Sequence, residues 1–133
     1  MMLNRIIDDY VVSDQISEKD IEKLKEAGFK TIFCNRPDGE EQNQPFTKSI
    51  WDKATENGLD FFDQPVIGDQ ISEDDVKEFS ILYDAAEKPI FAYCRTGTRC
   101  SMLWALSESG KRPIDEILQL TSAAGYNLSN LFR

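Results

Sequence analysis

The stretch Phe91-Ala92-Tyr93-Cys94-Arg95-Thr96-Gly97-Thr98-Arg99-Cys100-Ser101 decides the fold, because it joins an apolar run to a polar loop that leads into a second apolar run. Residues 89–93 predict a buried strand, and residues 102–106 predict a buried helix that ends near Gly110. A strand, a tight polar loop and a helix in this order direct several backbone N–H groups at one point. The sequence therefore predicts an anion-binding loop.

This loop carries the side chains that a nucleophilic site needs. Cys94 comes first, and backbone dipoles and guanidinium groups stabilise a thiolate in such a position. Gly97 permits the conformation of a tight loop, while Arg99 can hold two oxygens of an oxyanion in its fork. We predict that Cys94 is a nucleophile, the alternative being a small buried hydrophobic residue. The predicted anion-binding residues are Arg95, Thr96, Gly97, Thr98 and Arg99.

Composition limits the class of protein. A chain of 133 residues with 41% hydrophobic content predicts a single domain over residues 1–133. The formal net charge of −9 argues against nucleic acid or an anionic membrane as a partner. We expect instead a small oxyanion, a persulfide or a phosphorylated substrate. With no signal peptide and no membrane-length apolar run, we expect a cytoplasmic protein with reduced thiols.

The absence of histidine from the sequence restricts the chemistry. It excludes a Cys-His catalytic pair and a His-ligated metal, so backbone dipoles and arginine must activate Cys94. The cysteines Cys34, Cys94 and Cys100 show no paired zinc spacing, and we expect no metal or other cofactor. Cys34 is expected in the core.

Strand and helix patterns alternate along the rest of the chain. Together they predict one α/β domain with a mainly parallel central sheet flanked by helices. The expected strands are residues 5–7, 10–12, 29–34, 59–66 and 89–93, and the expected helices are residues 17–28, 46–57, 72–86, 100–110 and 113–125. Ser17 with Asp20 resembles a capping box, and Ser72 is the expected N-cap of the third helix. In the second helix Phe46, Ile50, Trp51 and Ala54 form one apolar stripe, and Trp51 is expected in the core.

A second polar loop, residues 35–41, follows the predicted strand that ends at Cys34. Ligands of open α/β sheets bind at such strand ends. Arg36 would add positive charge to the anion site, and Asp38 would act as an acid or fix Arg36 by a salt bridge. The alternative is an ordinary turn, because Pro-Asp-Gly is itself a strong turn sequence.

Three segments resemble one bacterial family, the phosphatase-like domain of beta-lactamase-hydrolase-like proteins (DUF442). They are Asn35-Arg36-Pro37-Asp38-Gly39-Glu40, the loop from Cys94 to Arg99, and Ala123-Ala124-Gly125-Tyr126. The resemblance implies a fold similar to dual-specificity phosphatases, with Arg36 and Asp38 at the site. It also implies a general acid at Asp69, with Asp63 as an alternative. The other interpretation of Asp69 is a turn or capping residue, because it follows a glycine just before a predicted helix. Because some relatives are fused to sulfur-metabolising hydrolase domains, it implies a possible partner enzyme of that kind.

The active loop departs from the phosphatase pattern. Cysteine phosphatases place five residues between Cys and Arg and usually a His before the Cys, whereas four residues separate Cys94 from Arg99, and Tyr93 comes first. A shorter ring of amides leaves less room for a phosphoryl group and is similar to the loop of rhodanese-type sulfurtransferases. We therefore favour sulfur transfer through a Cys94 persulfide. Phosphomonoester hydrolysis through a phosphocysteine is the alternative, and a weakly active anion-binding regulatory domain is a second.

Cys100 is a further departure, since a serine usually follows the arginine in such loops. Three roles remain open for it from the sequence. It would lower or share the charge on Cys94, resolve an oxidised Cys94 as a disulfide, or fill space as a small buried residue.

Overall fold

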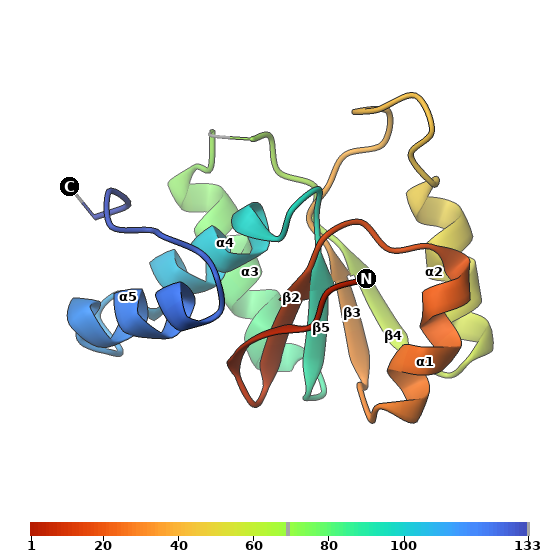
Figure 1. The fold of residues 1–133 in the computed structure, drawn as a ribbon, viewed down its shortest axis with the longest axis horizontal. Coiled ribbons are helices and arrows are strands. Elements are labelled where there is room, and N and C mark those ends of the chain that lie inside the picture. The colour runs from red at the N-terminus through yellow and green to blue at the C-terminus, as the bar shows by residue number, and fades with distance from the viewer. Residues whose placement is uncertain (69, 133) are drawn as a thin grey trace.

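In the part of the chain that the structure describes, five strands form one mixed sheet with the order β1-β2-β5-β3-β4 (Figure 1). The structure is a computed structural model that describes residues 1–68 and 70–132. β1 pairs with β2 in antiparallel fashion, and the other three pairs are parallel. This arrangement confirms the predicted α/β fold with a mainly parallel sheet. The strands are β1 (Asn4–Ile7), β2 (Tyr10–Ser13), β3 (Thr31–Cys34), β4 (Asp60–Asp63) and β5 (Ile90–Tyr93).

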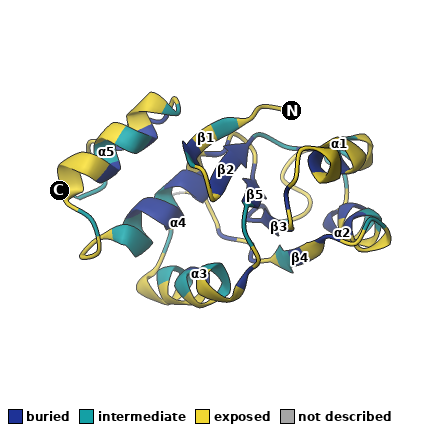
Figure 2. Cartoon of the chain, turned by 90° about the horizontal axis from the view of Figure 1, so that it is seen from below, coloured by how far each residue is buried: buried dark blue, intermediate teal, exposed yellow. Residues whose placement is uncertain are grey.

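Helices cover both faces of this sheet (Figure 2). α1 and α2 lie on one side, α3 and α4 lie on the other, and α5 packs outside α4. Every helix in the described ranges is too short or too polar to cross a bilayer. The helices are a short 3₁₀ helix (Glu18–Asp20), α1 (Ile21–Glu26), α2 (Thr47–Glu56), α3 (Glu73–Ala85), α4 (Thr98–Glu108) and α5 (Ile114–Ala123).

The central strand β5 divides its side chains between two apolar clusters. Ile90 and Ala92 belong to the cluster under α3, α4 and α5, and Cys94 continues that alternation at the strand's end. Phe91 and Tyr93 belong to the cluster under α1 and α2. A strand buried on both faces reads as a continuous apolar run, which explains the sequence of residues 89–93. The alternation also sets the direction of Cys94, on the α4 side of the sheet.

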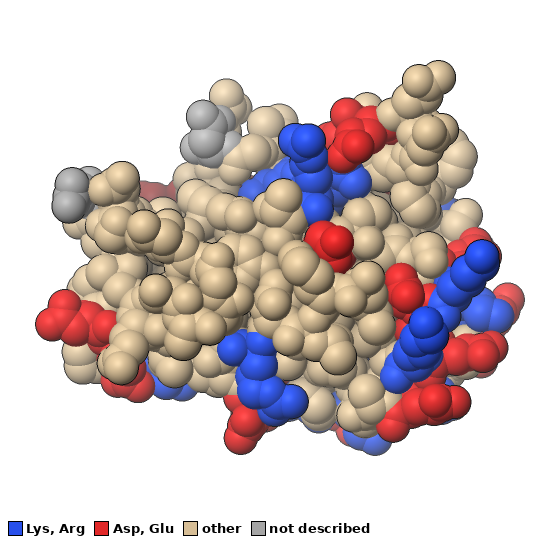
Figure 3. Space-filling model, in the orientation of Figure 1, with Lys and Arg blue, Asp and Glu red and all other residues tan. Residues whose placement is uncertain are grey.

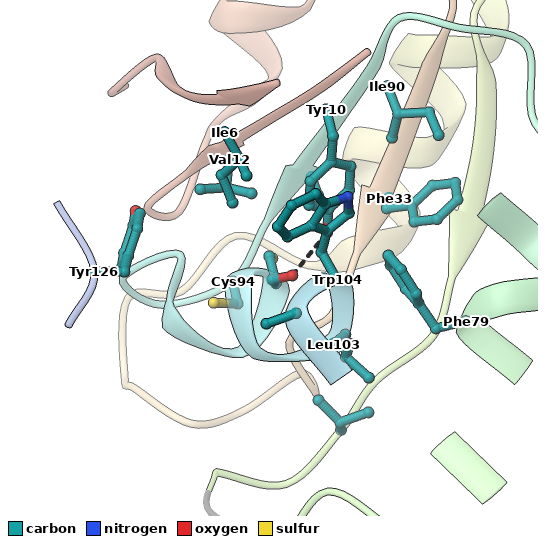
Figure 4. Close-up of a cluster of buried hydrophobic side chains, with 14 of the residues drawn as sticks. Ile6, Tyr10, Val12, Phe33, Phe79, Ile90, Cys94, Leu103, Trp104 and Tyr126 are labelled. Atoms are coloured by element: carbon teal, nitrogen blue, oxygen red, sulfur yellow. Dashed lines mark hydrogen bonds between the residues drawn. The ribbon is translucent and has the colours of Figure 1, made fainter. Parts of the chain in front are cut away.

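The buried helix α4 is held against β2 by aromatic packing (Figure 4). Trp104 is fully buried and stacks on Tyr10 with ring centroids 6.5 Å apart. The Tyr10 hydroxyl also donates a hydrogen bond to the Cys100 carbonyl at 2.9 Å. Truncating a tryptophan in such a site costs about 3–5 kcal/mol. These contacts fix the first turn of α4, which follows the Cys94 loop.

Several expected elements differ in detail from the structure. The helix expected over residues 17–28 is a 3₁₀ helix followed by α1, and the strand expected from residue 29 begins at Thr31. The helix expected from residue 46 begins at Thr47, and Phe46 precedes it with 70% of its surface exposed. Trp51, expected in the core, is 40% exposed and stacks on Phe61 from the outside. The strand expected over residues 59–66 ends at Asp63, although the Gln64 and Val66 N–H groups still donate to the Cys34 and Asn35 carbonyls at 2.9 and 3.1 Å.

Candidate active site

The site lies where the parallel strands end. β5 leads into the Cys94 loop (Figure 1). Its neighbour β3 leads into residues 35–46, which include the second polar loop at residues 35–41. Figure 3 shows basic and acidic side chains side by side at this end of the molecule. Salt bridges at the ends of β3 and β5 join Arg36, Arg95 and Arg99 to Glu40 and Glu41, so this cluster keeps one positive charge in a chain of net charge −9.

Cys94 sits at the base of its loop with only 1% of its surface exposed. The Gly97 N–H donates to the Cys94 sulfur at 3.1 Å. The pKa of Cys94 is lowered to about 5, first by a hydrogen bond from the Cys100 thiol and then by the backbone amides of Cys100, Thr96 and Gly97, against the opposing effect of burial. A thiolate is therefore the stable form of Cys94 at neutral pH.

The turn at Gly97 directs these amides. Gly97 has φ +91°, the left-handed conformation that glycine adopts without strain, and it caps the N-terminus of α4. Its carbonyl accepts a hydrogen bond from the buried Ser101 hydroxyl at 2.9 Å. The positive end of the α4 dipole consequently faces the loop that begins at Cys94.

Arg99, 7% exposed, is oriented by a carboxylate from the second loop. Its Nη1 and Nη2 atoms donate to Glu40 Oε2 and Oε1, both at 2.8 Å, and Nη1 also donates to the Val66 carbonyl at 2.9 Å. Of the five N–H groups of an arginine, three are used. The Nε–H and the second Nη2–H have no hydrogen-bond partner in the described part of the chain, and that edge can take two oxygens of an oxyanion.

Arg36 is a second arginine that holds the Glu40 carboxylate in place. Its Nε donates to Glu40 Oε1 at 2.8 Å, and its Nη2 donates to Glu41 at 2.7 Å. Hydrogen bonds from Arg99 and then from Arg36 lower the pKa of Glu40 to about 2. Arg36 itself is 2% exposed, so the structure places it behind Glu40, as a support for the carboxylate that holds Arg99.

The remaining loop residues predicted to bind an anion lie at the surface. The Arg95 side chain is 64% exposed, and its Nε lies 3.2 Å from Glu41 Oε1. The hydroxyls of Thr96 and Thr98 share a hydrogen bond at 2.9 Å. The structure thus gathers Cys94, Gly97 and Arg99 tightly and leaves these three side chains around the rim.

The aspartates considered as acids occupy different places. Asp38 Oδ1 accepts hydrogen bonds from the Thr47 N–H and hydroxyl, at 2.8 and 2.9 Å, and so supports the start of α2. Asp63 is aligned with Cys34 on β3, which places it two strand spacings, roughly 10 Å across the sheet, from β5. Burial and the charge of Asp38 raise the pKa of Asp63. Asp69 lies outside the described residues.

The other two cysteines are buried free thiols. Cys100 is fully buried, and the hydrogen bond from its thiol is the main cause of the low pKa of Cys94, which corresponds to the first role considered from the sequence. Burial raises the pKa of Cys100 itself, so it remains a thiol donor. Cys34 is 1% exposed and packs in the cluster under α1 and α2, as expected of a core residue.

Sequence reasoning assigned no role to two residues that contact the site. Glu40 was present only as part of the family motif, although its position four residues after Arg36 is a signal for an ion pair. Tyr126 lies in the tail, and its hydroxyl donates to the Thr96 carbonyl at 3.0 Å. Nothing in the local sequence around Tyr126 indicates that contact, because 30 residues separate the partners.

Known proteins are similar to this chain in sequence and in fold. The sequence model of the family described as "Beta-lactamase hydrolase-like protein, phosphatase-like domain" matches residues 3–111. A beta-lactamase hydrolase-like protein of Xylella fastidiosa is 35% identical over 119 residues, which is 88% of this chain and 28% of the relative. The chain therefore spans less than a third of that relative's length.

Solved structures agree with this comparison. A crystal structure from Neisseria meningitidis, described as a candidate phosphatase, has a TM-score of 0.88 at 41% identity and covers 98% of this chain and 93% of that one. The structure of Tk-PTP in its active form has a TM-score of 0.76 at 16% identity, covering 94% and 85%, and shows a shared fold. The resemblance drawn from the two loops and the tail is confirmed, and the chain belongs to the phosphatase-like domain family of the beta-lactamase hydrolase-like proteins.

Proposed function

We propose that this domain hydrolyses phosphate monoesters through a phosphocysteine at Cys94. One observation carries the proposal: a thiolate with a pKa of about 5 and a guanidinium held by Glu40 lie on the same short loop. The family and its neighbours support the phosphatase alternative of the sequence analysis and give no support to sulfur transfer.

The reaction would proceed in two displacements. The Cys94 thiolate attacks phosphorus, forming an S–P bond while the P–O bond to the leaving group breaks. The leaving oxygen takes a proton from a general acid. A water molecule then attacks phosphorus and gives one proton to the general acid, which is now a carboxylate. The S–P bond breaks, and inorganic phosphate leaves with Cys94 again a thiolate and the acid restored. Because Cys94 is 1% exposed, the phosphoryl group must enter the loop itself to reach the sulfur.

The free edge of Arg99 and the loop amides would stabilise the transferring group. Charge is spread over three equatorial oxygens in phosphoryl transfer, so fixed donors aimed at them lower the barrier. The Nε–H and Nη2–H of Arg99 suit two of these oxygens, and the rim side chain of Arg95 adds positive charge. Asp69 remains the acid that the family resemblance implies, since Asp38 is engaged with Thr47.

Sulfur transfer is the second candidate, favoured by the four-residue spacing between Cys94 and Arg99. In that reaction the Cys94 thiolate would take the outer sulfur of a persulfide or thiosulfate donor, releasing a thiolate or sulfite. The Cys94 persulfide would then pass this sulfur to a thiol acceptor. Such a cycle needs no acid for a leaving oxygen, so it would not depend on Asp69.

The deciding experiment gives the wild-type protein two substrates in parallel. para-Nitrophenyl phosphate should be hydrolysed by the wild type and by Cys34→Ser, but not by Cys94→Ser, and Asp69→Asn should slow the reaction at least a hundredfold. Intact mass after exposure to thiosulfate should show no added sulfur. One sulfur added to wild type but not to Cys94→Ser, together with no phosphate release, would overturn the proposal and favour sulfur transfer.

A further inference from the structure

Tyr126 connects the C-terminal tail to the Cys94 loop. It is 8% exposed and lies at the edge of the same apolar cluster as Cys94 (Figure 4). Its hydroxyl donates to the Thr96 carbonyl at 3.0 Å and accepts a hydrogen bond from Asn4 Nδ2 at 2.8 Å. The Asn4 amide thereby fixes which way the hydroxyl proton points. Residue 126 lies beyond residues 3–111, the part that matches the family's sequence model.

The tyrosine ring also presses on the turn of the loop. A Cβ atom placed on Gly97 would lie 2.2 Å from Tyr126 Oη and 2.9 Å from Cζ, far inside van der Waals contact. Tyr126 therefore packs directly on the Gly97 backbone. The loop is held from outside by a side chain that leaves no space for any residue larger than glycine.

The hydrogen bond from the Tyr126 hydroxyl and the packing of Tyr126 on Gly97 both involve the peptide group between Thr96 and Gly97. The carbonyl that accepts from Tyr126 belongs to Thr96, and the N–H of the same peptide unit, that of Gly97, donates to Cys94 Sγ at 3.1 Å. A peptide unit is planar, and in the trans form its C=O and N–H point in opposite directions. Fixing the carbonyl on one side therefore fixes the direction of the N–H on the other. A donor on the carbonyl also polarises the N–H, as hydrogen bonds in a chain strengthen one another.

We propose that Tyr126 is a positioning residue of the active site, which anchors and polarises the Thr96–Gly97 peptide so that its N–H stabilises the Cys94 thiolate. Asn4 orients the Tyr126 hydroxyl for this task. Tyr126 does not touch substrate in this role and acts only through the peptide. The stabilisation of the thiolate is independent of the reaction catalysed, and only its effect on turnover rests on the proposed phosphatase function.

Other ionisable groups also affect the pKa of Cys94. Cys100 and Arg99 reach its sulfur from α4, and Tyr10 reaches it from β2. Each of these is unchanged when the Tyr126 hydroxyl is removed. A shift in the ionisation of Cys94 in such a variant consequently reports the Thr96–Gly97 peptide.

The test removes this single hydroxyl. In Tyr126→Phe, the pH midpoint for alkylation of Cys94 by iodoacetamide, followed by peptide mass, should move upward, with about a two- to tenfold change in the ionisation constant, as expected for one hydrogen bond. Asn4→Ala should shift it in the same direction by less. The matched control is Tyr83→Phe, which removes the hydroxyl of another partly buried tyrosine, on α3, and should leave the midpoint unchanged.

Two readouts separate this proposal from the proposed function. An upward shift in Tyr126→Phe supports the positioning role even if wild type fails to hydrolyse para-nitrophenyl phosphate, in which case the phosphatase assignment alone fails. With hydrolysis present, kcat/KM should fall about two- to tenfold at a pH roughly one unit below the wild-type midpoint, where the thiolate fraction falls almost in proportion to the ionisation constant. A midpoint in both Tyr126→Phe and Asn4→Ala that equals that of wild type would overturn the positioning role.

Discussion

Arg99 and Glu40 meet end to end, with both terminal nitrogens of the guanidinium on both oxygens of the carboxylate at 2.8 Å. The partners are 59 residues apart in the chain, and they come from the first turn of α4 and from the loop that follows β3. Since this pair uses the far edge of Arg99, it directs the other edge toward an incoming oxyanion instead of competing for it. The pair is therefore best understood as part of the binding apparatus.

Replacing Glu40 should weaken anion binding. Glu40→Gln removes the negative charge that orients Arg99, so we expect the inhibition constant of vanadate to rise about tenfold and the free energy of unfolding to fall by about 2 kcal/mol. Urea unfolding and steady-state inhibition would measure both. Glu41→Gln is the matched control, because Glu41 contacts Arg36 and Arg95 but not Arg99, and it should have a smaller effect on both quantities. Equal effects in the two variants would contradict the assigned role of Glu40.

The same pair predicts how stability depends on pH. The pKa of Glu40 is lowered to about 2 in the folded protein, below the ordinary value of an unfolded glutamate. Its contribution is therefore complete above the unfolded pKa and is lost as pH falls through the folded one. The stability difference between wild type and Glu40→Gln should shrink between about pH 4.5 and pH 2. Urea unfolding at a series of pH values would show it, and a constant difference across that range would argue against the pair.

Cys100 should control the ionisation of Cys94. In wild type the rate of Cys94 alkylation should rise through a midpoint near pH 5. Cys100→Ala removes the strongest donor to the sulfur, so the midpoint should move to higher pH, whereas Cys100→Ser keeps a hydroxyl donor and should shift it less. The order wild type, Cys100→Ser, Cys100→Ala is the expected ranking. An unshifted midpoint in Cys100→Ala would show that the backbone amides alone lower the pKa of Cys94.

Two glycines with the same backbone conformation allow a controlled test of the Gly97 turn. Gly97 has φ +91° and Gly110 has φ +89°, but only Gly97 has atoms within 4 Å of an added Cβ. Gly110→Ala should cost about 1 kcal/mol from the left-handed conformation alone. Gly97→Ala should cost roughly 1–3 kcal/mol more, because Tyr126 must move. Thermal unfolding measures the difference, and similar costs at both positions would contradict the close packing of Tyr126.

We expect Asp38 to have a structural role and not to act as the general acid. Its Oδ1 atom accepts two hydrogen bonds from Thr47 at the start of α2, so Asp38→Ala should lower the free energy of unfolding by about 1 kcal/mol. Asp38→Asn keeps that oxygen and should leave both stability and the rate of phosphate release close to wild type. A fall of a hundredfold or more in the rate for Asp38→Asn would instead identify Asp38 as the general acid.

The sequence predicted those features that depend on neighbouring residues. The capping box expected at Ser17 and the N-cap expected at Ser72 are both present, and each joins residues three positions apart. The strand, loop and helix around Cys94 were likewise expected from one apolar run on either side of a polar turn. Phe46 was misjudged, since helical spacing alone does not show that the helix starts one residue later, with this side chain outside it.

Contacts between residues that are distant in the sequence could not be predicted from local patterns. Arg36 was expected at the anion site, but the structure commits its guanidinium to Glu40, Glu41 and Gln15. The length of the Cys94 loop favoured sulfur transfer, whereas the comparisons favour a phosphatase. The number of residues between Cys94 and Arg99 does not show that Glu40, from another loop, orients the Arg99 guanidinium. Contacts between loops arise from the order of strands in the sheet, and a local pattern does not contain that order.

The meeting of Asn4 and Tyr126 above Thr96 has a practical consequence for anyone who expresses or recombines this domain. A boundary drawn at residue 111, where the family's sequence model stops matching, would retain all five strands and the whole Cys94 loop. Such a fragment would nevertheless lose α5, whose Ile117 is buried in the core cluster, together with the side chain that fastens the Thr96 carbonyl. Its thiol would be harder to ionise although every residue of the signature motif was still present. Cloning limits, fusion joints and split points should therefore fall beyond Tyr126.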